Sequence, residues 1–239
     1  MSDLLEIVRA RHSAREPFDP QLPISRQDLE KILEAARWAP TAHNMQNFEI
    51  VVVDDQQRLQ AIGSIGSQVS ETFLRENYLQ MSFSEEELLN KKTGVLASMF
   101  PASWRKPDAT PDAAIEILHS FLGDALQQST LLLVVIYDAT QRAPASEGDV
   151  LGMMSLGCVM ENMWLMAQSL GIGCQILSTF STAGVEGQVG AILNIPPPMK
   201  IAFACRFGFL ASKPAKYLRV RRDIDDFVHH NRFGNRGFD

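Results

Sequence analysis

The chain has 239 residues, of which 46% are apolar, so it is long enough to bury a sizeable hydrophobic core without disulfides. Its formal net charge of −6 argues against nucleic acid as the main partner, because binding to a phosphate backbone needs a broad basic surface. The first residues, MSDLLEIVRARHS, carry acids and no long apolar run, so we expect no signal peptide and a cytoplasmic location.

The three cysteines indicate reduced thiols rather than a disulfide framework. Cys158, Cys174 and Cys205 are odd in number, far apart in sequence and form no CxxC pair. Free cysteines are mostly small buried hydrophobes. The most apolar stretch, 150–170, is interrupted by Glu161 and two amides, so we predict a buried helix rather than a membrane span.

The first third of the chain alternates helix and strand. Leucines and a valine on one face predict a short helix over 3–11. Ser25 and Asp28 resemble a capping box, and apolar residues at helical spacing then predict a helix over 26–38. A β-branched run predicts a strand over 48–53.

The middle of the chain is irregular. Its segment SMFPASWRKPDATPD contains three prolines and has no clear periodicity. We interpret about 66–125 as a lid-like excursion inserted into a single domain that spans 1–239. The helical pieces predicted in this part of the chain are 57–62, 68–80 and 113–128.

The second half again alternates strands with helices, which indicates a mixed α and β class. Its helix over 149–170 is apolar nearly all round, so we expect it at the centre of the fold or in a dimer interface. A C-terminal arm follows from about 212 to 239. The predicted elements are strand 131–137, helix 149–170, an extended segment within 169–180, helix 185–193 and strand 201–209.

Most standard motifs of enzyme chemistry are absent. The chain has no P-loop, no HExxH and no GxSxG elbow, and its five histidines have no metal-ligand spacing. Gly171-Ile172-Gly173 lacks the third glycine of a dinucleotide fingerprint and follows a helix rather than a strand. We therefore predict no metal site and no Rossmann site.

Two basic clusters remain, at residues 11–15 (RHSAR) and 219–222 (RVRR). Guanidinium groups match phosphate oxygens in pairs, and a serine hydroxyl adds another donor. Together the clusters would suit a phosphomonoester. The alternative is that both are solvent-exposed loop charges.

These residues also carry a family resemblance. RHSAREPF (11–18), followed by APTAHNMQ (39–46) before a strand, resembles the nitroreductase family of flavin enzymes. The similarity continues in LGIG (170–173), FGF (207–209) and RR (221–222), and spans most of the chain outside about 60–125. The chain departs from the family pattern at Asn47 and Ser178.

The resemblance implies an α+β fold, with a three-layer α/β/α sandwich around a central, mostly antiparallel sheet. It also implies an obligate homodimer with FMN held at the subunit interface.

The resemblance implies three groups of cofactor contacts and no catalytic residue, because the cofactor supplies the hard step. The phosphate and ribityl chain would be bound by Arg11, His12, Ser13, Arg15, Arg219 and Arg221, with Arg222 as an alternative to either tail arginine. The flavin ring would contact Pro40, Thr41, Asn44 and Gln46, contributed by the other subunit. The ring edge at N5 would face the backbone of Ile176, Leu177 and Ser178.

The implied activity is transfer of hydride from NADH or NADPH, through flavin N5, to a small aromatic acceptor such as a nitroaromatic or a quinone. Alternatives are a reductive dehalogenase or other flavin enzyme on the same fold, or a non-catalytic flavin-binding module. Aromatic side chains of the excursion would cover the ring, or else only pack the insertion. They are Phe73, Tyr78, Phe83, Phe100 and Trp104.

Overall fold

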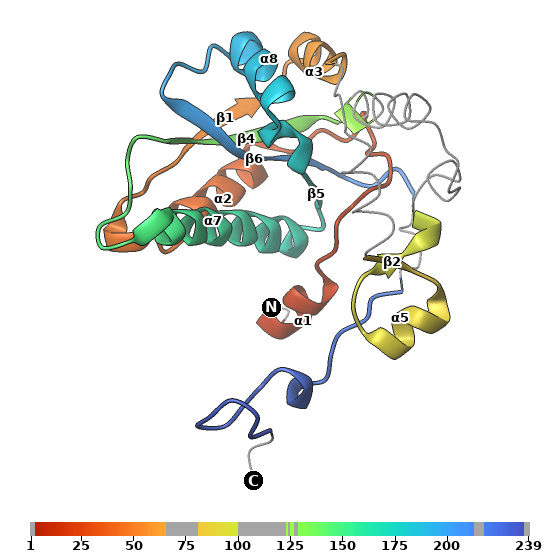
Figure 1. Ribbon diagram of the computed structural model, residues 1–239. Helices are drawn as coiled ribbons and strands as arrows, with labels where there is room; N and C mark the ends of the chain where they lie inside the picture. Colours follow the sequence, from red (N-terminus) through yellow and green to blue (C-terminus); the bar gives the residue numbers. More distant parts are fainter. Residues whose placement is uncertain are drawn as a thin grey trace. The chain divides into compact units, whose positions relative to one another are not determined.

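The computed structural model describes residues 3–65, 81–99, 123, 125–126, 129–212 and 218–236. The chain divides into two compact units (Figure 1). Unit 1 comprises Met1–Ser67 and His119–Pro214, and unit 2 comprises Gln68–Leu118 and Ala215–Asp239. Unit 2 nearly coincides with the predicted excursion and arm, while the single-domain organisation stays a prediction.

Unit 1 is built on a four-stranded antiparallel sheet, which confirms an α+β fold with a mostly antiparallel sheet. The strand order is β1-β4-β6-β5, and each neighbouring pair is antiparallel. β5 therefore lies at one edge. The strands are β1 (Glu49–Val53), β4 (Leu131–Asp138), β5 (Gly173–Leu177) and β6 (Met199–Gly208).

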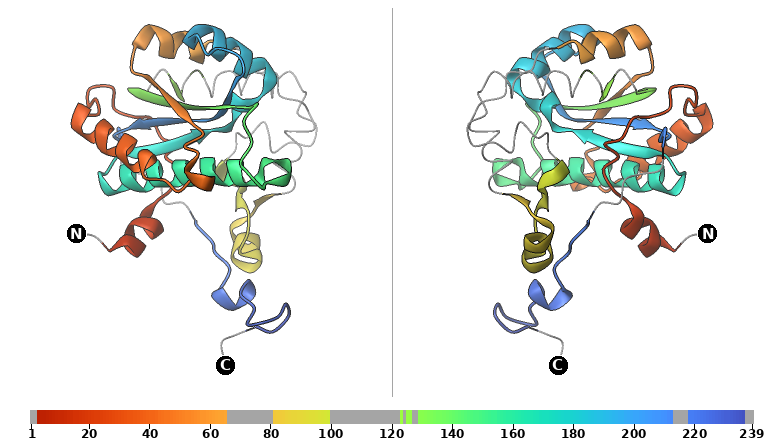
Figure 2. Two further views of the ribbon diagram at one scale, coloured as in Figure 1. Left: turned by 90° about the vertical axis from the view of Figure 1, so that its left-hand side faces the viewer. Right: turned by 90° about the vertical axis from the view of Figure 1, so that its right-hand side faces the viewer.

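Helices lie on both faces of this sheet (Figure 2). α2 (Arg26–Arg37) and α7 (Val150–Ser169) pack on one face, and α3 (Gln56–Gly63) and α8 (Ala183–Leu193) on the other. Strand side chains alternate between faces, so Leu133 joins the α2/α7 core and Leu132 joins the α3/α8 core. Burial on both faces explains why β4 is apolar without a break.

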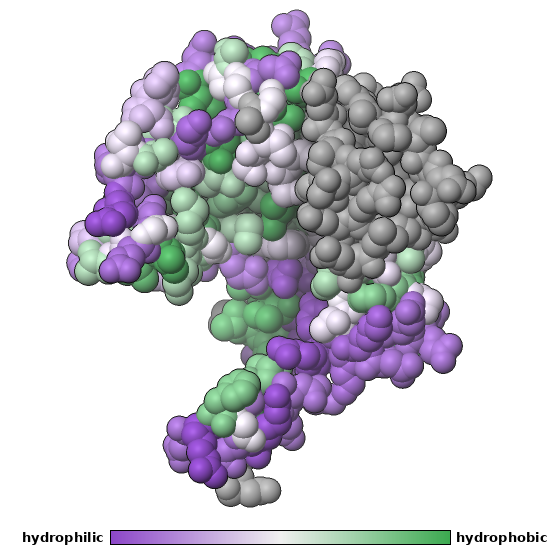
Figure 3. All heavy atoms as spheres, viewed as in Figure 1, coloured by the Kyte–Doolittle hydropathy of each residue, from purple (hydrophilic) through white to green (hydrophobic). Residues whose placement is uncertain are grey.

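α7 is only partly covered within unit 1. Leu156, Val159 and Met163 of its inner face are buried against the sheet, whereas Val150 and Met154 are 58% and 61% exposed. Helix α1 (Leu4–Ala10) contacts α7 and exposes Leu4 as well. Figure 3 shows apolar surface over α1. The outer side of α7 thus remains open to a further partner.

The segment Glu147–Ser169, which contains α7, is also the helix that, among the described residues, is long and apolar enough to cross a membrane. Its inner face packs on α2 and the sheet, as in a core helix. The cytoplasmic location stays a prediction.

The helix caps explain most of the observed boundaries. Ser25 accepts the backbone N–H of Asp28 at 3.1 Å, which caps α2 as predicted. The predicted capping box is incomplete, because the Asp28 carboxylate accepts the Ser25 hydroxyl at 2.8 Å instead of closing on the Ser25 backbone. At the C-terminal end of α8, the cap residue Asn194 adopts the left-handed conformation and ends the helix.

Unit 2 holds a small folded segment that the sequence pattern missed. Strands β2 (Ser82–Phe83) and β3 (Val95–Leu96) pair in parallel, and α5 (Glu85–Lys91) runs between them. Ser84 and Glu87 form a complete capping box, a signal that could have predicted α5.

The described part of the arm lies in the same unit. It contains one short 3₁₀ helix, η7 (Ile224–Asp226), and Lys92 forms an ion pair with Asp223. The predicted helix over 68–80 lies outside the described residues, as does most of 113–128.

Candidate functional site

Residues 11–18, here called the strap, are tied to α7 at their first end. The Nε of Arg11 lies 3.2 Å from Oε1 of Glu161, and its guanidinium lies 4.3 Å from the Trp164 ring centroid. The indole N–H of Trp164 also donates to the His12 carbonyl at 3.1 Å. Arg11 is half-buried, and the carboxylate of Glu161 and the ring of Trp164 orient its guanidinium group.

The middle of the strap runs along the open edge of β5. Ser13 forms a parallel bridge with Cys174, and the N–H of Ala14 donates to the Cys174 carbonyl at 2.9 Å. The backbone groups of one strand residue point to one side and those of the next residue to the other. The Ile176 backbone therefore faces the same open edge as Cys174.

The residues predicted to face the N5 edge of the flavin, Ile176, Leu177 and Ser178, differ in what they expose. The Leu177 side chain is 4% exposed and belongs to the α3/α8 core, and by the same alternation its backbone faces Ala204 of β6. Ser178 is exposed at the start of a 3₁₀ turn, Ser178–Ser181. Contact of these residues with a flavin ring stays a prediction.

The last part of the strap crosses to the α3/α8 face and is buried there. A Cβ at Gly173 or Gly208 would lie 2.9 Å or 2.5 Å from atoms of the Phe18 ring, so both glycines leave room for this side chain. Arg206 of β6 stacks on Phe18 with its guanidinium 4.3 Å from the ring centroid. Burial lowers the pKa of Arg206 to about 10, and Glu16 acts in the opposite direction.

The second predicted segment, here called the 40–47 loop, has an unusual backbone. His43, Asn44 and Gln46 have positive φ values of 50°, 53° and 47°, a region that non-glycine residues rarely adopt. Such outliers concentrate at ligand-binding and active sites. The 40–47 loop is therefore a site candidate on its backbone alone.

A few hydrogen bonds hold the 40–47 loop. The N–H of Ala42 donates to the Ser155 hydroxyl of α7 at 2.9 Å, and the N–H of Gln46 donates to the Thr41 hydroxyl at 3.0 Å. The Asn44 and Gln46 side chains are exposed. The buried Oδ1 of Asn47 has no hydrogen-bond partner among the described residues.

Within one chain, the strap and the 40–47 loop contact different turns of α7. The loop is held at Ser155 and the strap at Glu161 and Trp164. Glu161 follows Ser155 by six positions and Trp164 follows it by nine, which corresponds to rises of about 9 Å and about 13.5 Å along the helix. The structure thus brings the residues of each group together but keeps the two groups apart along α7.

Arg219 and Arg221 lie in unit 2, so their meeting with the strap stays a prediction. Arg221 donates to the Val220 carbonyl at 2.7 Å, and Arg222 lies 5.4 Å from the Phe227 ring centroid. Of the five predicted lid aromatics, Phe83 is described, and Lys91 lies 3.9 Å from its ring centroid. The other four lie outside the described residues.

Two of the three thiols are closed to solvent. Cys174 and Cys205 are buried, Cys158 is half-buried, and none of the three is in a disulfide. Burial raises the pKa of Cys174 well above its ordinary value, and a hydrogen bond with Cys205 adds to the shift. Among the described residues, no group of three or more His, Cys, Asp or Glu side chains is placed to hold a metal ion.

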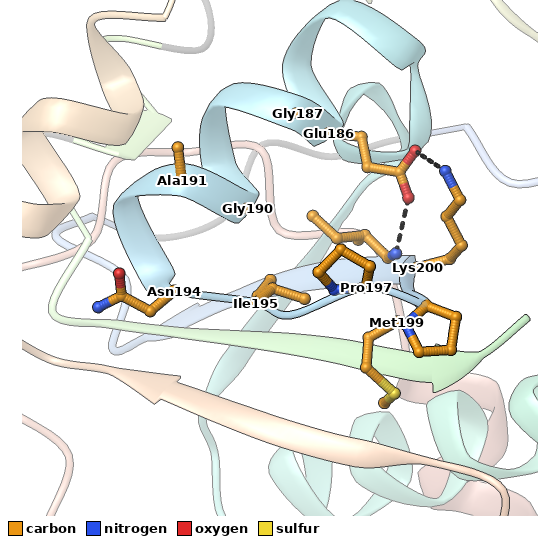
Figure 4. Close-up of a pocket in the computed structure, with 11 residues that line it drawn as sticks. Glu186, Gly187, Gly190, Ala191, Asn194, Ile195, Pro197, Met199 and Lys200 are labelled. Carbon is orange, nitrogen blue, oxygen red and sulfur yellow. Dashed lines mark hydrogen bonds and ion pairs between the residues drawn. The ribbon is translucent and has the colours of Figure 1, made fainter.

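A hollow of about 640 Å³ lies between α8 and the start of β6, away from the predicted site residues (Figure 4). Glu186 accepts the Ile201 N–H at 2.9 Å and lies 3.6 Å from Lys200. Apart from Asn194, the other residues that line the hollow are small or apolar, and none of the lining residues was predicted to bind a ligand.

Sequence reasoning missed three side chains that contact the strap and hold it in place. Glu161 and Trp164 orient Arg11 and His12, and Arg206 holds the buried end of the strap. Arg206 and Glu161 each carried a signal, as a charge inside an otherwise apolar strand or helix. Trp164 looks like an ordinary position of an apolar helix.

The strap thus lies along the open edge of a mostly antiparallel sheet in an α+β fold, the class of fold that the family resemblance implied. The chain belongs to the nitroreductase family, whose sequence profile matches residues 8–209.

Among curated proteins, it is 43% identical over 53 residues to the CLA biosynthesis enone reductase of Lactiplantibacillus plantarum, covering 22% of this chain and 24% of that protein. It is 32% identical over 66 residues to YdgI of Bacillus subtilis, whose name assigns it provisionally to the NAD(P)H nitroreductases. That match covers 28% of this chain and 31% of YdgI. The matched parts thus span about a quarter to a third of these relatives.

Solved structures resemble the whole chain at low identity and therefore support the fold alone. A nitroreductase with bound FMN from Bacteroides fragilis has a TM-score of 0.59 and 19% identity, covering 96% of this chain and 99% of that one. An FMN-dependent nitroreductase from Clostridium difficile has a TM-score of 0.59 and 16% identity, with the same coverage of 96% and 99%.

Proposed function

We propose that the protein is an FMN-dependent oxidoreductase that uses NADH or NADPH as reductant. Membership of the nitroreductase family supports this proposal. Further support comes from the names of relatives, which mention FMN for two solved structures and NAD(P)H for YdgI.

The residues of the strap fit a flavin mononucleotide. Arg11, His12, Ser13 and Arg15 would bind the phosphate and ribityl chain, completed by Arg219 and Arg221. The observation that carries the proposal is the strap itself, which presents guanidinium and hydroxyl donors beside the open edge of β5. Such a donor set matches a phosphate monoester better than a neutral ligand.

The 40–47 loop and the β5 edge fit the ring. The ring would be lined by Pro40, Thr41, Asn44 and Gln46. The buried Oδ1 of Asn47 is an acceptor without a hydrogen-bond partner among the described residues, so it could accept from a ligand. The backbone at Ile176 and Ser178 would supply N–H donors to the other ring edge, whereas Leu177 pairs with Ala204 of β6. When bound, FMN supplies the two-electron chemistry, and these residues bind it, orient it and exclude water.

We further propose a homodimer with the three-layer α/β/α arrangement in each subunit. The apolar residues exposed on α1 and the outer side of α7 support a second copy as the cover of this face. The separation of the strap from the 40–47 loop along α7 also supports it, since a loop from the partner subunit would complete the site.

The proposed acceptors are nitroaromatic and quinone compounds. A second candidate is an enone, because the protein with 43% identity over 53 residues is named an enone reductase. NAD(P)H oxidation with a nitroaromatic, menadione and a simple enone would rank the three classes. A yellow protein that oxidises no NAD(P)H with any acceptor would favour the flavin-binding module instead.

The binding residues are tested by the double variant Arg11→Ala/Arg15→Ala. We expect colourless protein after purification, with FMN affinity reduced by about 100-fold or more, because two charge-assisted contacts are lost. The matched control is Arg26→Ala/Arg58→Ala, which removes two exposed arginines elsewhere in unit 1. Circular dichroism should show both variants folded. Normal FMN affinity in the strap variant would refute the proposed site.

A further inference from the structure

Arg206 is an arginine in the middle of an apolar strand. It lies between Cys205 and Phe207, and the whole residue is 1% exposed. A buried charge is stable only when it is well hydrogen-bonded, because it has left water. Its partners therefore show what this arginine does.

Four hydrogen bonds surround the guanidinium group. Nε donates to Oε1 of Gln175 at 2.7 Å, and Nη1 donates to the Ala125 carbonyl at 3.1 Å. Nη2 donates to the carbonyls of Ala14 and Glu16 at 3.1 Å and 2.9 Å. Since a guanidinium has five N–H groups, at least four are engaged inside the protein. Arg206 is thus placed to hold protein groups rather than a ligand.

The two strap carbonyls that Arg206 binds lie on either side of Arg15. Ala14 is held a second time, because its N–H donates to the Cys174 carbonyl at 2.9 Å. Arg15 itself is exposed, while Ala14 is fully buried. The backbone around Arg15 is therefore fixed from inside the protein and its side chain is free to meet a ligand.

Arg11 is fixed differently. It contacts Glu161 and Trp164 of α7, which packs on the other face of the sheet. Loss of Arg206 should therefore loosen Arg15 and leave the Arg11 end of the strap in place.

We propose that Arg206 is a positioning residue that acts through Arg15 and sets the preference for a phosphorylated over an unphosphorylated flavin. This rests on the proposed function, since it assumes that the strap binds the FMN phosphate. It differs from a purely structural role, which would weaken every flavin equally.

The test compares FMN with riboflavin, which lacks the phosphate. The full-length protein is freed of flavin, and both dissociation constants are measured by fluorescence for the wild type, Arg206→Lys, Arg15→Ala and the double variant. Lysine keeps the charge but lacks the planar fork that reaches two carbonyls. We expect Arg206→Lys to lower FMN affinity about tenfold and riboflavin affinity less than about twofold. The control Arg26→Lys, on exposed α2, should change neither.

In the Arg15→Ala background, Arg206→Lys should have little further effect on FMN, because the group it positions is gone. Equal losses for FMN and riboflavin would overturn the proposal. So would an undiminished effect of Arg206→Lys in the Arg15→Ala background.

Gln175→Met covers the case in which Arg206→Lys does not fold. It keeps the arginine and removes only the acceptor of its Nε. We expect an FMN-selective loss of about threefold, in the same direction. An unchanged ratio of FMN to riboflavin affinity would overturn the proposal and leave the proposed function standing. A wild type that binds neither flavin would overturn the proposed function itself.

Discussion

The strap and the 40–47 loop carry most of the predicted cofactor contacts, but they are held in opposite ways. The strap has no positive-φ residue and is anchored on both sheet faces, at the half-buried Trp164 and the buried Arg206. The 40–47 loop has three positive-φ residues and one hydrogen bond to a side chain of α7. Under the proposed function, phosphate binding would rest on a preorganised segment, and ring binding on a strained segment that a ligand or a second subunit would stabilise.

The largest expected effect is on the strap. Gly208→Ala would place a Cβ 2.5 Å from Cγ of the buried Phe18, so the free energy of unfolding should fall by about 3 kcal/mol. Thermal unfolding measures the change. In the matched control Gly187→Ala, the new Cβ meets nothing within 4 Å and α8 should gain about 1 kcal/mol. A Gly208→Ala variant as stable as the wild type would contradict the packing described for Phe18.

A smaller effect is expected where the 40–47 loop joins α7. Ser155→Ala removes the hydroxyl that accepts the Ala42 N–H at 2.9 Å. The unfolding free energy should fall by about 1–2 kcal/mol, because a partly buried donor loses its partner. Proteolysis within 40–47 should also accelerate, while the strap stays protected. Faster cleavage in the strap instead would show that the two regions are coupled.

The equivalent change at the strap is Trp164→Phe. It retains an aromatic face for Arg11 and removes the N–H that donates to the His12 carbonyl at 3.1 Å. We expect a loss of about 1 kcal/mol in unfolding free energy and little change in FMN affinity, since other anchors remain. A large drop in FMN affinity would mean that the strap depends on a single anchor.

The smallest expected effect is a gain in stability rather than a loss. Gln46→Gly relieves a φ of 47° and should raise the unfolding free energy by about 0.5 kcal/mol. Gln60→Gly, inside α3, should lower it by about 1 kcal/mol. Chemical denaturation of both variants separates strain relief from the general effect of glycine. Equal destabilisation would show that the 40–47 loop is unstrained.

The sheet and its main helices were predictable because their signals are local. The apolar run of β4, the largely apolar run of β6 and the helical spacing of α2 and α7 can each be read within one segment of the sequence. The α5 segment was missed because it is short and acidic, although Ser84 and Glu87 mark its start.

The candidate site was predictable only through its motifs. The pairing of Arg11 with Glu161 joins residues far apart in the chain, and no pattern within either segment requires it. Arg206 depends in the same way on carbonyls that approach only after folding. Positive φ at His43 and Gln46 is also set by context, since neither residue demands that conformation.

The glycines of α8 should make this helix open locally more often than α7 on the opposite face of the sheet. Gly184, Gly187 and Gly190 lie in an eleven-residue helix, and an added Cβ at each would meet nothing within 4 Å. Each glycine weakens a helix by about 1 kcal/mol relative to alanine. Amide protons of α8 should therefore exchange with deuterium well before those of α7, through opening that stops short of global unfolding. The hollow beside Glu186 should change in volume when α8 opens locally, while α7 on the opposite face of the sheet stays folded.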